Sequence, residues 1–148
     1  AIELEAAAWR ALDNEIAHFP DDNAGYFASG PSWLDGPYVL DQKALFEALL
    51  GGIEAGAPAD RLALDFHVAV ARSSARIATE ICAHEGIGTV ALSGGVFMNQ
   101  LLLQLLIREL KDAGLTVLVP QTVPVNDGCI AYGQAAVASA RLAQIASQ

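Results

Sequence analysis

The stretch from Thr89 to Asn99 constrains the fold of this chain more than any other. Its first four residues, 89–92, are β-branched or apolar, as in a strand inside a sheet. Gly94 and Gly95 follow, and glycine permits backbone angles at which amide N–H groups converge on a ligand. Asn99 is a preferred N-cap residue, and a leucine-rich run comes directly after it. A strand, a glycine turn and a helix start together predict a site for an anion, usually a phosphate.

A second turn of similar character, residues 125–129, lies one helix and one strand further along the chain. Either Asn126 or Asp127 can cap the helix that follows, so one of the two polar side chains is left without a capping role. A bare carboxylate would repel phosphate, so Asp127 is a candidate ligand for a divalent metal that bridges to phosphate. We expect the two turns to form facing walls of one nucleotide site. The alternative is that both are tight packing turns whose polar side chains only cap helices.

The rest of the pattern predicts a helix-rich α/β fold. Helical periodicity is found over residues 2–17, 41–53, 58–84, 100–113 and 128–143, with Asp41 as a cap and strands over 89–93 and 116–119. Residues 26–28 and 38–40 are candidates for a short hairpin. The last third reads strand–helix–strand–helix, for which parallel strands with a right-handed crossover are expected. We interpret residues 1–148 as a single partial domain, with more strands expected upstream.

Composition narrows the classes of function. The net charge is −9 with only eight Lys and Arg residues, which disfavours a nucleic-acid surface. An apolar fraction of 53% supports a sizeable core. No apolar run approaches the roughly 20 residues that span a bilayer, so no membrane role is expected. Cys82 and Cys129 are too few for a disulfide framework, and a cytoplasmic location is expected.

Other polar residues give weaker signals. Glu3 and Glu5 lie on the first predicted helix, where a carboxylate could accept both hydroxyls of a ribose, although a solvent-exposed helix face is the simpler interpretation. Ser93 lacks the G-x-S-x-G surroundings of a nucleophile. The three histidines, His18, His67 and His84, show no metal-pair spacing, so structural roles are expected. Cys82 is expected in the core, and Phe97 and Met98 are expected to pack beneath the glycine turn.

Two motifs carry a family resemblance. VALSGGVFMN at residues 90–99 and PVNDGCIAYGQA at residues 124–135 resemble the C-terminal part of HypF-type carbamoyltransferases, which mature nickel–iron hydrogenases. The opening AIELEA and the LDFH segment at residues 64–67 resemble that family too, so the likeness covers essentially the whole chain. The resemblance implies the second, C-terminal ribonuclease-H-like lobe of a sugar-kinase/actin/Hsp70-type (ASKHA) fold. The paired motifs are shared with tRNA threonylcarbamoyl-transferases.

What the resemblance implies for chemistry is carbamoyl transfer from carbamoyl-adenylate to the C-terminal cysteine of the partner HypE. ATP or carbamoyl-adenylate would be the nucleotide, and a divalent metal would lie at its phosphates. No catalytic nucleophile is expected in this chain. Asp127 would be the metal ligand, and the residues implied to contact the nucleotide are Glu5, Ser93, Gly94, Gly95, Asn99, Asn126 and Gly128.

The chain departs from the family pattern in ways that shape these expectations. The family's histidine-rich metal motif and its acylphosphatase-like, zinc-finger and adenylate-forming domains are absent from these residues. Cys129 stands where a glycine is more usual, and no Lys or Arg lies near it in sequence to activate the thiol. Alone, the chain is expected to bind nucleotide weakly, to be catalytically silent and to be able to form a homodimer. A nucleotide-binding interaction module and a tRNA threonylcarbamoyl-transferase relative are the alternatives.

Overall fold

The computed structural model describes residues 2–14 and 42–146. Its elements, in chain order, are helices α1 (Ile2–Asn14), α2 (Gln42–Glu54) and α3 (Ala59–Glu85), strand β1 (Thr89–Ala91), the 3-10 turn η1 (Gly95–Met98), helix α4 (Gln100–Asp112), strand β2 (Thr116–Leu118), the 3-10 turn η2 (Asp127–Cys129) and helix α5 (Ile130–Ala146). The strand–helix–strand–helix order of the last third is confirmed. The hairpin predicted at residues 26–28 and 38–40, the Asp41 cap and residues 15–17 of the first predicted helix lie outside the described residues.

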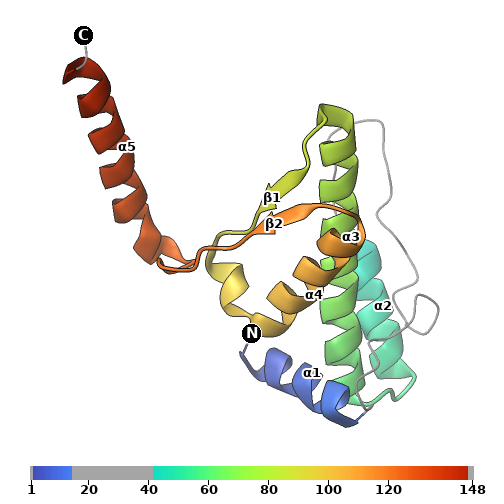
Figure 1. The fold of residues 1–148 in the computed structure, drawn as a ribbon. Coiled ribbons are helices and arrows are strands. Elements are labelled where there is room, and N and C mark those ends of the chain that lie inside the picture. The colour runs from blue at the N-terminus through green and yellow to red at the C-terminus, as the bar shows by residue number, and fades with distance from the viewer. Residues whose placement is uncertain (1, 15–41, 147–148) are drawn as a thin grey trace.

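Helix α3 is the central element of the molecule, and α1 and α4 pack along it (Figure 1). The core between these three helices is built from leucine and alanine. Leu64 of α3 and Leu101 and Leu110 of α4 are fully buried, and Ala8 of α1 meets the same cluster. The small alanines allow the helices to approach closely while the leucines fill the space between them. Cys82 is buried near the end of α3, which confirms its predicted core position.

Helices α1 and α2 are attached to the start of α3. Arg10 of α1 donates to Asp60 at 2.9 Å, and this hydrogen bond, with the charge of Asp60, raises the pKa of the Arg10 guanidinium. The pair is solvent-exposed, so it contributes little to stability. Helix α2 touches α3 at Gly52, where an added Cβ would overlap one δ-methyl group of Leu62. A side chain at this position would therefore require the Leu62 side chain to move.

The sheet consists of two parallel strands, with Thr89 opposite Thr116 and Ala91 opposite Leu118. Val90 and Val117 are partly buried against the helical core, whereas the residues on either side of each valine are exposed. The strand predicted over 89–93 ends at Ala91, although the Leu92 amide still donates to the Leu118 carbonyl. The burial predicted for residues 89–92 holds for Leu92 and partly for Val90, and it was wrong for the two residues that are exposed. The described residues provide only two strands and cover only one face, although parallel sheets are normally covered on both.

Helix α5 extends away from the rest of the molecule (Figure 1). It begins at Ile130, after η2, rather than at Gly128 as predicted, and it contains no buried residue. Its exposed apolar side chains include Ile130, Tyr132, Val137, Leu142 and Ile145. None of the helices in the described part of the chain is both long enough and apolar enough to span a bilayer.

Candidate nucleotide-binding site

The two turns lie side by side, as the sequence predicts. The Gly94 amide donates to the Val125 carbonyl at 2.7 Å, which joins the first turn directly to the second. The Asn126 amide nitrogen also lies 3.5 Å from the Met98 sulfur. Gly94 has φ 120°, a conformation that side-chain-bearing residues rarely adopt, so this junction requires glycine. The carboxyl ends of β1 and β2 therefore open onto one shared edge.

Of the two glycines in the first turn, Gly95 is the more open to solvent. It is exposed, it begins η1, and an added Cβ would meet no atom within 4 Å. Within residues 2–14 and 42–146, no hydrogen bond is found from its amide, whereas the Gly94 amide is occupied by Val125. Nothing in the part of the chain that the structure describes demands glycine at position 95, so the free amide and the space beside it suit an approaching anion. Ser93, the preceding residue, is also exposed.

Asn99 caps helix α4, as predicted, because its Oδ1 accepts from the Leu102 amide at 2.8 Å. Its amide nitrogen faces Nε2 of the buried His67 at 2.8 Å. The other ring nitrogen of His67, Nδ1, lies 2.8 Å from the Ala63 carbonyl. Both polar ends of the Asn99 side chain are thus engaged. The structural role expected for His67 is supported, but its partner 32 residues away could not be read from the sequence.

Glu5 takes a position that neither interpretation of the sequence foresaw. Its Oε1 accepts from the Gln100 amide at 2.7 Å and from the Leu101 amide at 3.2 Å, so a carboxylate from α1 lies at the N-terminus of α4. A negative charge there is favoured by the helix dipole. The predicted contact of Glu5 with ribose stays a prediction. Glu3, two residues earlier, is exposed as expected for a solvated helix face.

The second turn separates the roles of its two polar side chains. Asn126 Oδ1 accepts from the Gly128 amide at 3.1 Å, so Asn126 supplies the cap. Asp127 is exposed, and no hydrogen bond or ion pair to its carboxylate is found in the described part of the chain. A Cβ at Gly128 would lie 3.1 Å from Asn126 Oδ1, so this glycine keeps the turn tight. Cys129 is half-buried.

The metal prediction can be compared with the available donors. No group of three or more His, Cys, Asp or Glu side chains converges among the described residues. Asp127 therefore offers a single free carboxylate, which fits a metal only if other ligands come from elsewhere.

The packing expected of Phe97 is confirmed, but that of Met98 was wrong, because its side chain is 61% exposed.

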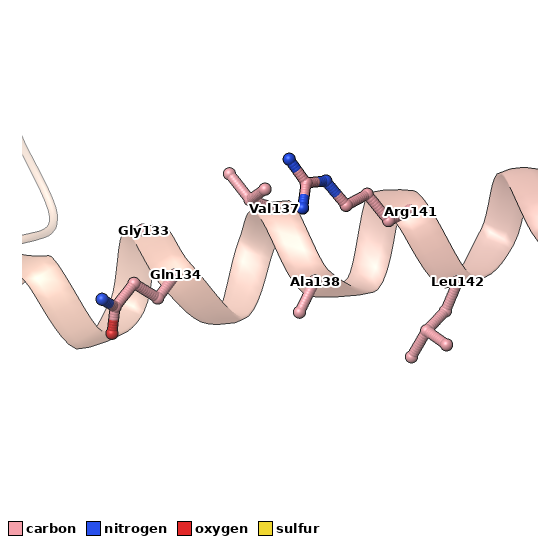
Figure 2. Close-up of a pocket in the computed structure, with 6 residues that line it drawn as sticks. All are labelled: Gly133, Gln134, Val137, Ala138, Arg141 and Leu142. Carbon is pink, nitrogen blue, oxygen red and sulfur yellow. The ribbon is translucent and has the colours of Figure 1, made fainter.

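The surface depression shown in Figure 2 does not belong to this site. Its lining residues all come from one helix, α5, and they are Gly133, Gln134, Val137, Ala138, Arg141 and Leu142. Because one helix alone cannot enclose a ligand, the depression is the open flank of α5. It contains neither Gly95 nor Asp127.

The helix-rich architecture, with its small parallel sheet and paired turns, is that of an ASKHA-type fold. A crystal structure of full-length HypF in the phosphate- and nucleotide-bound form superposes with a TM-score of 0.75 at 29% identity, over 95% of this chain. HypF from T. kodakarensis gives 0.72, also at 29% identity, over 97% of this chain.

Sequence comparison then identifies the family. Residues 1–134 match the family described as carbamoyltransferase, Kae1-like domain, second subdomain. A carbamoyltransferase HypF homolog from Cupriavidus necator is 36% identical over 94% of this chain, and a carbamoyltransferase HypF from Synechocystis is 31% identical over 90% of it. The chain belongs to the HypF carbamoyltransferase family.

The chain corresponds to a small part of these relatives. It spans 34% of the length of the Cupriavidus homolog and 16% of the Synechocystis protein. It covers 17% of each of the two HypF crystal structures.

Proposed function

We propose that residues 1–148 form the C-terminal lobe of a carbamoyltransferase domain, and that its two turns hold the phosphates of a nucleotide. The observation that carries this proposal is the junction of the turns through Gly94 and Val125. Gly95, next to Gly94, has an amide without a partner among the described residues, and Asp127, two residues after Val125, has a carboxylate without one. A HypF relative with 29% identity is described as phosphate- and nucleotide-bound, which supports a nucleotide as the ligand.

The proposed reaction transfers a carbamoyl group from carbamoyl-adenylate to the C-terminal cysteine of HypE. The cysteine thiolate attacks the carbamoyl carbon, a C–S bond forms, and the C–O bond to the phosphate breaks as AMP leaves. The resulting thiocarbamate is the precursor of a cyanide ligand in a nickel–iron hydrogenase. Because the acyl-adenylate is already activated, this lobe would contribute orientation and stabilisation of charge on the leaving phosphate.

The side chains of the site divide these tasks. The Gly95 amide would donate to a phosphate oxygen, and Asn126 and Gly128 would hold the second turn in place. Asp127 would hold a divalent metal together with ligands from an upstream segment, and that metal would neutralise phosphate charge. The nucleophile would come from the partner, which is consistent with the half-buried position of Cys129.

Replacement of Asp127 tests the proposal. In the full-length enzyme, Asp127→Ala is expected to abolish carbamoyl transfer to the HypE cysteine, detected by the intact mass of HypE after incubation with carbamoyl-phosphate and ATP. Glu54→Ala is the matched control, because Glu54 is an exposed acid on α2, outside the two turns. Transfer that survives in Asp127→Ala would remove this residue from the site.

The same mixture separates an enzyme from a nucleotide-binding interaction module, since only the enzyme forms a thiocarbamate. A tRNA threonylcarbamoyl-transferase would need a basic RNA-facing surface, against which the net charge of −9 counts. The 148-residue chain alone is expected to bind ATP and Mg²⁺ weakly in a calorimetric titration. Sub-micromolar affinity would contradict the need for a second lobe.

A further inference from the structure

His67 is a buried, titratable side chain to which the proposed reaction gives no part. It lies on α3, the central helix, with only 4% of its surface exposed. A backbone carbonyl can only accept, so the contact with Ala63 requires the proton on Nδ1. In that neutral tautomer Nε2 is an acceptor, and it receives the Asn99 amide N–H. The hydrogen bonds therefore define both the tautomer of His67 and the orientation of the Asn99 amide.

Asn99 closes the loop that carries Gly95. Its backbone amide donates to the Val96 carbonyl, and the Phe97 amide donates to the Gly94 carbonyl, so the loop is one continuous chain of turns ending at Asn99. The other end of the loop is fixed by the bond from Gly94 to Val125. Between these two anchors the Gly95 amide has no partner among the described residues, so its direction depends on them.

We infer that His67 is a positioning residue for the Gly94–Asn99 loop. Its unprotonated Nε2 keeps the Asn99 amide nitrogen turned towards α3 and the Asn99 oxygen turned towards the Leu102 amide. A reversed Asn99 amide would face Nε2 with an acceptor and Leu102 N–H with a donor, so both contacts would be lost together. His67 thereby connects the buried core to the open glycine turn. This role adds a residue to the proposed nucleotide site. Only the identity of the ligand depends on the proposed function.

Three replacements separate this role from plain packing. In His67→Gln, the amide reaches about as far as Nε2 and can still accept from Asn99. In His67→Asn, the shorter amide reaches about as far as Nδ1 and can keep only the Ala63 contact. His67→Phe retains an aromatic ring and loses both hydrogen bonds, the one with Asn99 and the one with Ala63. The same 148-residue chain serves for all three, with far-UV circular dichroism as the check on helix content.

Amide NMR without ligand gives the first readout. His67→Gln is expected to keep the Gly95 amide resonance near its wild-type position and to keep the Leu102 amide protected. His67→Asn and His67→Phe are expected to shift the Gly95 resonance and to speed hydrogen exchange at Leu102 roughly tenfold, as for a lost helix cap. The inference is overturned if His67→Asn matches the wild type, or if His67→Gln is as perturbed as His67→Asn.

Two further measurements keep the result independent of folding defects and of the proposed function. Nitrogen NMR of the wild-type ring should show a proton on Nδ1 and none on Nε2, and the opposite tautomer would overturn the inference without any variant. Titration with ATP and Mg²⁺ should perturb Gly95 in the wild type and in His67→Gln, and several-fold less in His67→Asn. A wild type whose Gly95 resonance does not respond to ATP but which keeps the unliganded pattern would count against nucleotide binding by this lobe alone, and it would still support the role of His67.

Discussion

The chain contains two strand–turn–helix units that are alike locally and different in their packing. The first comprises β1, η1 and α4, and the second comprises β2, η2 and α5. Each has a three-residue strand and a short 3-10 turn, and in each an asparagine side chain caps the turn or the helix. Yet α4 is lined by buried leucines (Leu101, Leu102, Leu105, Leu106 and Leu110), whereas α5 has no buried residue.

The difference shows that local signals and tertiary packing are separate sources of structure. Caps and turns need only residues a few positions apart, so both units form them. Burial needs a neighbour, and α4 lies against α3 and β2 while α5 mainly contacts the adjoining η2. The glycine turn of the first unit is therefore held by the core, and the turn of the second is held chiefly by its own backbone and by the first turn.

The largest expected contrast is between leucines on the two helices. Leu101→Ala should lower the free energy of unfolding by about 2–5 kcal/mol, because Leu101 is fully buried and its loss leaves a cavity. Leu142→Ala, at a position 67% exposed, should change it by no more than about 0.5 kcal/mol. Urea unfolding followed by circular dichroism gives both values.

If Leu142→Ala lowered the free energy of unfolding as much as Leu101→Ala, the contrast between α4 and α5 would be wrong, because α5 would then be packed in solution. Sedimentation at several concentrations would show whether a second copy of the chain covers the helix, as the predicted homodimer requires.

A smaller contrast is expected between the two capping asparagines. Asn99→Ala should lower the free energy of unfolding by about 1–2 kcal/mol, because it removes the cap of α4 and leaves His67 Nε2 without its partner. Asn126→Ala should cost about 0.5 kcal/mol or less, because the turn that it caps leads into a helix without buried contacts. The same urea experiment measures both, and similar losses would mean that the second turn is as firmly held as the first.

Much of the local structure could be predicted from the sequence. Pro58 before α3 and Gly86 after it mark that helix to within about one residue, and Asn99 marks the start of α4. The adjacency of the two turns also followed from the pattern, because parallel strands end at a common edge of the sheet. These features depend on residues close in sequence or on a general rule of chain topology.

The contacts that build the site could not be predicted in the same way. Glu5 meets the Gln100 amide from 95 residues away, and His67 meets Asn99 from 32 residues away. The His67 contact requires α4 to pack on α3, and the Glu5 contact requires α1 to lie against the same helices. No spacing in the sequence encodes that arrangement. The apolar residues of α5 show the same limit, since their helical pattern does not reveal that the described residues leave them exposed.

The smallest expected contrast concerns two carboxylates near helix starts. Glu5→Gln should lower the free energy of unfolding by about 0.5–1 kcal/mol, because its Oε1 accepts two amides of α4 and its charge favours the helix dipole. Asp127→Asn should change it by less than about 0.5 kcal/mol, because no contact to this carboxylate is found in the described residues.

The dependence on salt concentration shows how much of each change in stability comes from the charge of the carboxylate. In urea unfolding, the loss of free energy of unfolding caused by Glu5→Gln should be smaller at high ionic strength than at low, because salt screens the charge. The change caused by Asp127→Asn should stay near zero at both. A carboxylate held by hydrogen bonds in the folded chain supports the fold, whereas one that stability does not require is free for a ligand. If Asp127→Asn instead destabilises the chain as much as Glu5→Gln, Asp127 is a structural cap, and the proposed metal contact loses its motive.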